Sequence, residues 1–190
     1  MTKTVSANTV AGRIAKLLKT CGVTQMFSQS LPSALVLAAE DIGIRQVTYR
    51  TENAGGAMAD GYARVSKKLG IVCAQNGPAA TLLVPPLAEA LKASVPLLAL
   101  VQEVPRGETD KNAFQDFDHL ALFSSCTKWA RTLREPARVD DTIRQAIVAA
   151  TSGRPGPVAV LLPADVLLAG FDDKAVSGFD GLGRWPLIRT

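Results

Sequence analysis

The fold of this chain is constrained most by three short runs of almost purely apolar residues, at positions 69–74, 95–101 and 158–162. A strand with one face in water alternates apolar and polar residues, whereas a continuous apolar run is typical of a strand covered on both faces. Turn-forming residues bound these runs: QNGP follows the first, and Pro163 ends the last. The runs therefore predict buried strands of a parallel sheet packed between helices.

Helical patterns alternate with these strands along the chain. Between residues 9 and 21, apolar side chains recur at the spacing of one helical stripe, and Gly22 ends the pattern. We expect further helices over 32–40, 52–66, 78–93 with a kink or split at Pro86, 117–125 and 140–150, and further strands over 24–27, 46–49 and 127–133. This alternation predicts an α/β, doubly wound, mostly parallel sheet of about six strands with helices on both faces.

Composition and charge exclude several classes of function. The chain has 190 residues, 47% hydrophobic and 20% charged, which excludes a disordered polymer. Its net charge of +4 is scattered without a Lys/Arg run, so we expect no nucleic-acid partner. Three prolines and two charged residues interrupt the most apolar region, 82–101, and the first residues do not resemble a secretory signal. We therefore expect a soluble, cytoplasmic protein without a membrane span.

The cysteines and the histidine offer little for metal or triad chemistry. Cys21, Cys73 and Cys126 are far apart, so we expect neither a disulfide framework nor a zinc site, but small apolar residues in a reducing compartment. His119 is the only histidine, which is too few for a multi-histidine metal site and leaves no clear Ser-His-Asp triad. We expect it in a surface or interface helix, and we assign no metal ligand to this chain.

One carboxylate stands out by its position. Glu52 lies where the β-branched run at 46–49 ends and a stretch of small residues begins. In a parallel α/β domain this boundary is the carboxyl edge of the sheet, where such folds bind ligands. The glycines that follow weaken the helix over 52–66, so close packing must hold it. A second candidate region is the polar segment 102–116, which is longer than most loops in compact domains.

The segment 52–64, ENAGGAMADGYAR, resembles the glutamate-helix segment of thiamin-diphosphate-dependent enzymes of the acetolactate synthase, pyruvate decarboxylase and benzoylformate decarboxylase group. Further landmarks of that group follow in the same order: GP at 77–78, NAFQD at 112–116, TK at 127–128, GRPGPV at 153–158 and PADV at 163–166. The resemblance is to the N-terminal, pyrimidine-binding domain of those enzymes. It implies this domain over residues 1–168 and a linker or tail over 169–190.

The resemblance also implies roles for particular residues. In that family the glutamate hydrogen-bonds the aminopyrimidine ring of the cofactor and favours its imino tautomer, which removes the proton from the thiazolium carbon; by position this residue is Glu52. Phe114 and Gln115 correspond to the Phe-Gln of acetolactate synthases, near the substrate. Gly77 and Pro78 correspond to a turn that faces the cofactor or the substrate. The implied catalytic residues are Glu52 and Gln115, and the implied cofactor-binding residues are Glu52, Gly77, Pro78 and Phe114. We interpret Lys128 as a strand-end lysine.

The family binds the diphosphate through Mg²⁺ held by a Gly-Asp-Gly motif and a later asparagine in a separate C-terminal domain. This chain has no Gly-Asp-Gly. The resemblance therefore implies thiamin diphosphate shared with a diphosphate-binding partner domain that holds the Mg²⁺; whether FAD is used stays open. Two alternatives remain: the chain is a fragment cut near Thr190, which the glycine-rich tail favours, or it is a natural small subunit.

Two turns depart from the family pattern. Residues 27–32 read FSQSLP where many members have Gly-x-Pro-Gly, and residues 77–82 read GPAATL where Gly-Pro-Gly followed by Thr-Asn is usual. The resemblance implies part of a 2-keto acid decarboxylase, with carboligation possible, that works as a dimer or higher oligomer and is inactive as an isolated chain. The two turns leave the keto acid open, and they motivate an alternative, a non-catalytic pairing module of the same fold. A dinucleotide-binding domain is disfavoured because no G-x-G-x-x-G follows the first strand.

Overall fold

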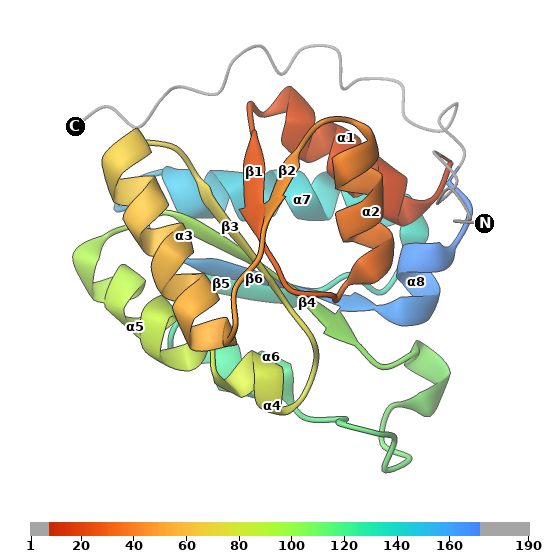
Figure 1. The fold of residues 1–190 in the computed structure, drawn as a ribbon. Helices are drawn as coiled ribbons and strands as arrows, with labels where there is room; N and C mark the ends of the chain where they lie inside the picture. Colours follow the sequence, from red (N-terminus) through yellow and green to blue (C-terminus); the bar gives the residue numbers. More distant parts are fainter. Residues whose placement is uncertain (1–7, 172–190) are drawn as a thin grey trace.

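The structure is a computed structural model that describes residues 8–171. Six strands form one sheet in the order β2-β1-β3-β4-β6-β5, and all their pairings are parallel (Figure 1). The strands are β1 (Gln25–Phe27), β2 (Arg45–Val47), β3 (Gly70–Ala74), β4 (Leu97–Glu103), β5 (Trp129–Thr132) and β6 (Val158–Pro163). The prediction of a parallel α/β sheet of about six strands is confirmed.

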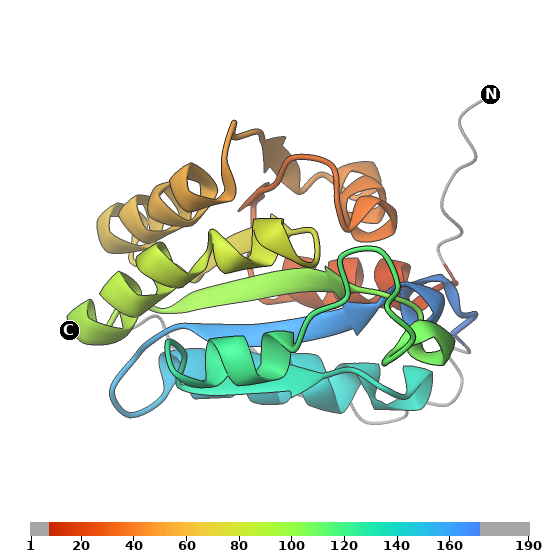
Figure 2. The ribbon, with the colours of Figure 1, turned by 90° about the horizontal axis from the view of Figure 1, so that it is seen from below.

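Helices cover both faces of the sheet (Figure 2). One face is covered by α1 (Val10–Thr20), α2 (Ser33–Asp41), α7 (Val139–Thr151) and α8 (Ala164–Leu168). The other is covered by α3 (Glu52–Ser66), α4 (Pro78–Thr81), α5 (Val84–Ala93) and α6 (His119–Ser124). Two single turns of 3₁₀-helix, Arg106–Glu108 and Pro136–Arg138, lie in the connections that leave β4 and β5.

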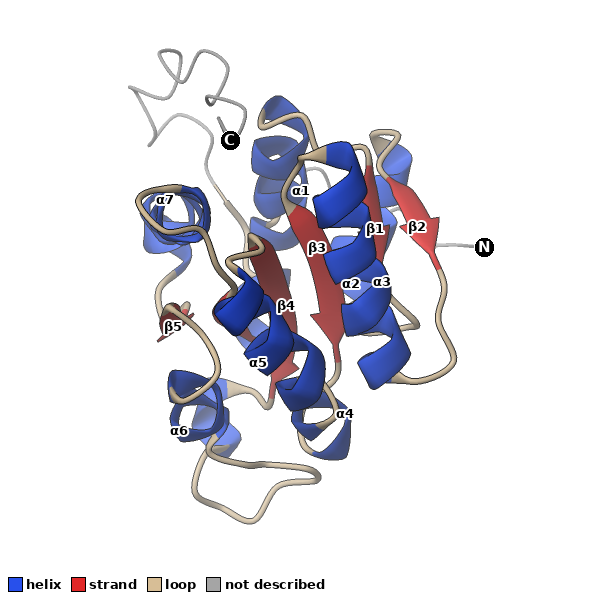
Figure 3. Ribbon diagram, turned by 90° about the vertical axis from the view of Figure 1, so that its left-hand side faces the viewer, coloured by secondary structure: helices blue, strands red, loops and turns tan. Residues whose placement is uncertain are grey.

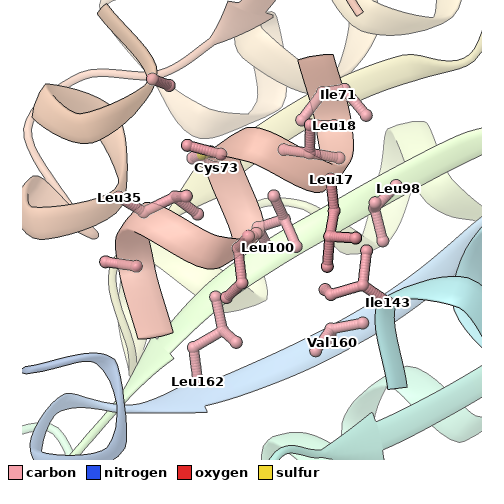
Figure 4. Packing of buried hydrophobic residues seen from close by; sticks show 14 of the residues in the cluster. Leu17, Leu18, Leu35, Ile71, Cys73, Leu98, Leu100, Ile143, Val160 and Leu162 are labelled. Atoms are coloured by element: carbon pink, nitrogen blue, oxygen red, sulfur yellow. The ribbon is translucent and has the colours of Figure 1, made fainter. Parts of the chain in front are cut away.

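The two apolar clusters between these layers follow from the alternation of side chains along the central strands. In β4, Leu98 and Leu100 face the layer of α1 and α7, whereas Leu97 and Ala99 face the layer of α3 and α5. Both sets are fully buried, as the continuous apolar run predicted. Figure 4 shows the first cluster, with side chains from α1, α2 and α7 against strands β3, β4 and β6.

Several expected boundaries shift in the structure. The helix expected over 78–93 is split, as predicted, but the break lies at residues 82–83 and both prolines fall in the first turn of α5, where a missing N–H costs no hydrogen bond. β2 ends at Val47 rather than at residue 49. β4 continues to Glu103, so the segment expected to be a loop from residue 102 begins two residues later. The single turn α8 was not expected.

Residues 169–171 of the expected linker pack against the beginning of α1. Val10 N–H donates to the Ala169 carbonyl at 3.0 Å, Gly170 pairs with Thr9 in an isolated bridge, and the Phe171 ring is buried in the first cluster. Residues 172–190 of that expected segment lie outside the described residues. Within the described part of the chain, no helix is long and apolar enough to cross a membrane.

Candidate functional site

The strand order places a topological switch point between β1 and β3, at the carboxyl edge of the sheet. β1 and β3 are neighbours, but the chain leaves β1 toward α2 on one face and leaves β3 toward α4 on the other. Such a switch point is where open α/β sheets bind ligands. Figure 3 shows that the β2–α3 connection, α4 and the long loop 104–118 all lie at this edge, the lower end in that view.

Glu52 is the first residue of α3 and therefore lies at this edge. Thr51 caps the helix by accepting a hydrogen bond from the Ala54 N–H at 3.4 Å, and a carboxylate in the first turn is favoured by the helix dipole. The Glu52 side chain is half-buried. Among the described residues its carboxylate has no hydrogen bond or ion pair. A carboxylate that is placed by the backbone and left without a protein partner can hydrogen-bond a ligand.

Close packing fixes the start of α3, as the glycine content predicted. A Cβ on Gly55 would lie 2.3 Å from the Tyr49 ring, and one on Gly56 would lie 2.4 Å from the Pro86 ring. Tyr49 donates its hydroxyl to the Cys73 carbonyl at 2.5 Å. Burial, and after it the charges of Cys73 and Glu52, raises the pKa of Tyr49, so the phenol stays neutral. The tyrosine therefore connects the turn before α3 to β3.

The turn after β3 requires glycine. Gly77 has φ +64° and ψ −128°, and a Cβ there would lie 2.7 Å from Gln115 Cβ and 3.0 Å from the Gln115 carbonyl oxygen. Pro78 follows at the first position of α4, where its fixed φ suits a helix start. The chain at Gly77 thus has the backbone of Gln115 directly against it.

Side chains of the same turn hold the loop after β4, in a set of contacts that we call the loop clamp (Gln75, Asn76, Phe114 and Gln115). Gln75 Nε2 donates to Gln115 Oε1 at 2.7 Å. Asn76 Nδ2 donates to the carbonyls of Phe114 and Gln115 at 3.2 and 3.0 Å, and Asn76 is only 6% exposed. The Phe114 ring, in contrast, is 81% exposed. The loop clamp therefore fixes the backbone of the loop and leaves the Phe114 ring exposed.

His119 lies in a helix with an exposed side, α6, but the expectation that the histidine itself would be at a surface or interface was wrong. Its side chain is buried, with 1% of the residue exposed. Its Nε2 accepts a hydrogen bond from the Gly77 N–H at 2.7 Å, and its Nδ1 lies 2.8 Å from Glu103 Oε1. The sequence showed a lone histidine in a short helix and could not show that the loop folds this helix back over the edge of the sheet. One usable signal was Glu103, a carboxylate two residues after the apolar run 95–101.

Ser28, in one of the two turns that depart from the family pattern, directly follows β1. It is fully buried, and among the described residues its Oγ is the buried side-chain oxygen without a hydrogen-bond partner. A buried hydroxyl without a partner costs free energy. The switch point therefore contains a buried hydroxyl group that lacks a hydrogen-bond partner among the described residues.

The structure brings four of the predicted site residues together and sets one apart. Gly77, Pro78, Phe114 and Gln115 form one contiguous group through the turn and the loop clamp. The start of α3, where Glu52 lies, is at the same edge (Figure 3), but among the described residues Glu52 has no hydrogen bond to that group. A cleft of about 790 Å³ also opens at this edge beneath the loop, lined by side chains that include Glu103, His119, Arg106 and Arg134.

Lys128 has a structural role, as interpreted from the sequence. Its Nζ donates to the carbonyls of Ala149 and Ser152 at 2.5 and 3.1 Å, and so satisfies the last turn of α7. Burial lowers the pKa of this lysine. A Cβ on Gly156 would lie 2.7 Å from its stem, which explains the glycine in the turn before β6.

Comparison with known proteins gives a consistent result. Acetolactate synthases are among the relatives: the mitochondrial catalytic subunit of Saccharomyces cerevisiae is 42% identical over 118 residues, 62% of this chain and 17% of that protein. A probable large subunit from Methanocaldococcus jannaschii is 38% identical over 160 residues, 82% of this chain and 27% of that protein. The chloroplastic acetolactate synthase of Arabidopsis thaliana is 44% identical over 123 residues, which are 65% of this chain and 18% of that protein. The chain thus spans about a sixth to a quarter of the length of these relatives.

The family model that matches is described as the N-terminal TPP binding domain of thiamine pyrophosphate enzymes, and it covers residues 8–122. That range includes β1 to β4, the start of α3, the turn after β3 and the loop clamp. It is more than half of the chain. The chain therefore belongs to the thiamine pyrophosphate enzyme family, as a domain of the N-terminal TPP-binding type.

Proposed function

We propose that this chain is the pyrimidine-binding part of an enzyme that decarboxylates a 2-keto acid and, as in acetolactate synthases, condenses the product with an acceptor. The observation that supports this most is Glu52: a half-buried carboxylate at the carboxyl edge of the sheet, fixed in the first turn of α3 and without a partner among the described residues. Family membership and acetolactate synthase relatives support the reaction class.

Each proposed residue has a distinct task. Thiamin diphosphate, when bound, would supply an acidic thiazolium carbon as the nucleophile for the keto group. Glu52 would share a proton with the aminopyrimidine ring, because a weakly basic ring nitrogen needs an adjacent carboxyl group. Gly77 and Pro78 would form the turn that carries Gln115 beside the cofactor. Phe114 would present an apolar wall, and the Gln115 amide would orient the substrate.

The residues present fit half of such a cofactor. The orphaned hydroxyl of Ser28, directly after β1, and the unpartnered carboxylate of Glu52, at the start of α3, lie at the carboxyl edge of the sheet. A diphosphate and its Mg²⁺ need several oxygen ligands and compensating charge. We propose that a diphosphate-binding domain, in the same or another chain, supplies them, and that residues 1–168 form the domain that pairs with it in a dimer or higher oligomer. We place the enzyme in the cytoplasm and leave the use of FAD open.

The test joins this chain to its diphosphate-binding domain, as one polypeptide or as two subunits. Release of CO₂ from a panel of 2-keto acids is measured with and without thiamin diphosphate and Mg²⁺. Turnover that depends on both is expected. Glu52→Gln, which keeps the size but removes the shared proton, should lower turnover at least about tenfold. Glu40→Gln, on the exposed end of α2, is the matched control and should leave turnover unchanged.

Two outcomes would contradict the proposal in different ways. If Glu52→Gln has the turnover of the parent, the role of Glu52 is wrong although the reaction class stands. If the assembled protein pairs and binds the cofactor but turns over none of the keto acids, the alternative of a non-catalytic pairing module is supported.

A further inference from the structure

A continuous line of buried hydrogen bonds runs from the end of β4 to the turn after β3. Glu103 is the last residue of β4, His119 is the first residue of α6, and Gly77 is the N-cap of α4. Glu103 Oε1 lies 2.8 Å from His119 Nδ1, and His119 Nε2 lies 2.7 Å from the Gly77 nitrogen. The side chains of His119 and Glu103 are 0% and 13% exposed.

The partners of the ring define its tautomer. The Gly77 backbone N–H can only donate, so Nε2 must accept and has no proton. The Glu103 carboxylate accepts, so Nδ1 must be the nitrogen that bears the proton. Both ring nitrogens are then occupied by protein groups, and neither is free to take a proton from a substrate or give one to it.

This line ends at Gly77, which packs against Gln115 of the loop clamp. Gln115 packs so closely against Gly77 that a Cβ on Gly77 would collide with it. The neighbouring side chains of Gln75 and Asn76 hydrogen-bond Gln115 and the Phe114 carbonyl. A shift of Gly77 therefore moves the surface on which this loop rests. Without the imidazole acceptor, the buried Gly77 N–H would be unpaired, and this penalty favours local opening of the turn.

We propose that Glu103 and His119 are positioning residues: Glu103 fixes the tautomer and orientation of the imidazole, the imidazole holds the amide of Gly77, and the turn at Gly77 in turn holds Phe114 and Gln115. The histidine is not an acid or base of the reaction. The importance of this positioning for catalysis rests on the proposed function, whereas the line of hydrogen bonds itself does not.

The experiment uses the 190-residue chain labelled with ¹⁵N, without cofactor. A long-range ¹H–¹⁵N spectrum reports which nitrogen of His119 bears the proton, and the Nδ1–H tautomer is expected. Amide hydrogen exchange is then measured at Gly77 and at Ala99, which lies in the central strand β4 and reports global opening. In His119→Phe, exchange at Gly77 should be faster than in the parent by at least about fivefold after correction for the change at Ala99.

Two further variants separate positioning from general stability. Glu103→Gln keeps an acceptor for Nδ1–H and should retain most of the protection at Gly77, whereas Glu103→Ala should lose it. Thr127→Ala removes another buried hydrogen bond next to α6, to the Phe123 carbonyl at 2.7 Å, and should affect Ala99 and Gly77 equally. An Nε2–H tautomer, or unchanged Gly77 exchange in His119→Phe, would overturn the proposal. These readouts need no turnover, so they can fail while the proposed function stands.

Discussion

Two buried pairs of charged and polar side chains have similar contacts and different consequences. Arg13 of α1 and Asp140 of α7 make two hydrogen bonds at 2.8 and 2.6 Å, with side chains 16% and 7% exposed. Glu103 and His119 are as close and as buried, on the opposite face of the sheet. The Arg13–Asp140 pair joins α1 and α7, two helices on the same face of the sheet. The second continues to a backbone amide in a loop, so the same chemistry stabilises the fold in one place and positions a site in the other.

The largest effect is expected from breaking the first pair. Asp140→Ala removes both hydrogen bonds to a largely buried guanidinium group and should lower the free energy of unfolding by about 3 kcal/mol. Denaturant titration measures it. Asp141→Ala, which breaks the exposed pair with Arg138 one residue away, should cost less than about 1 kcal/mol. Equal costs for the two variants would contradict the structural role of the Arg13–Asp140 pair.

A smaller effect is expected at Gly77, whose N–H donates to His119 of the second pair. Gly77→Ala should lower the free energy of unfolding by about 2 kcal/mol, because the backbone there suits only glycine and the added Cβ meets Gln115. Gly153→Ala also requires a positive φ but has open space around it, so it should cost about 1 kcal/mol. NMR shifts of Phe114 and Gln115 should change in the first variant only. If both variants cost the same and neither moves the loop, the close approach of Gln115 is incorrect.

The smallest effect concerns the pair that anchors the beginning of the same loop, Arg106 with Asp165 at 2.7 Å. Burial alone would raise the pKa of Asp165, but hydrogen bonds from the Arg106 backbone and side chain, with its charge, lower it overall. A lowered pKa means that the folded state holds the ionised form more strongly. This stabilisation is present above the ordinary aspartate pKa of about 3.9 and is lost as pH falls through the lower pKa of the folded state.

Asp165→Asn should therefore cost less than about 1 kcal/mol near neutral pH, and the difference from the parent should shrink as pH falls below about 4. Unfolding titrations at several pH values measure this. Glu135→Gln, on the more distant partner of Arg106 at 3.8 Å, is the control and should show no such trend. A difference that stays constant with pH would contradict the role of the Asp165 charge.

Much of the fold could be predicted from local pattern alone. The bounds of α3 were predicted as Glu52–Ser66 because Glu52 follows the β-branched run at 46–49 and begins a stretch of small residues. The buried strands were predicted because their apolar runs need cover on both faces. The order of the strands could not be predicted, since it depends on which face each crossover takes. The one-turn helix α8 was missed because five residues have too little periodicity to read.

The residues of the candidate site were proposed by resemblance, whereas their contacts could not be predicted from the sequence. Gly77 and Gln115 were chosen by resemblance, but their backbone contact brings together positions 38 residues apart, and only the folded loop defines it. His119 was misjudged for the same reason. Its burial comes from the return of the 104–118 loop over the sheet edge, and no local pattern marks a histidine that accepts a bond from a distant amide.

The central claim is that Glu52 handles the proton of the cofactor ring, and deuterium uptake tests it most directly. In the assembled protein with bound thiamin diphosphate, the rate of deuterium uptake at the acidic thiazolium carbon is measured by quenched-flow NMR for the parent, Glu52→Gln and the control Glu40→Gln. We predict uptake at least about tenfold slower in Glu52→Gln, with cofactor still bound, and unchanged in Glu40→Gln. Equal rates in the parent and in Glu52→Gln would contradict the account.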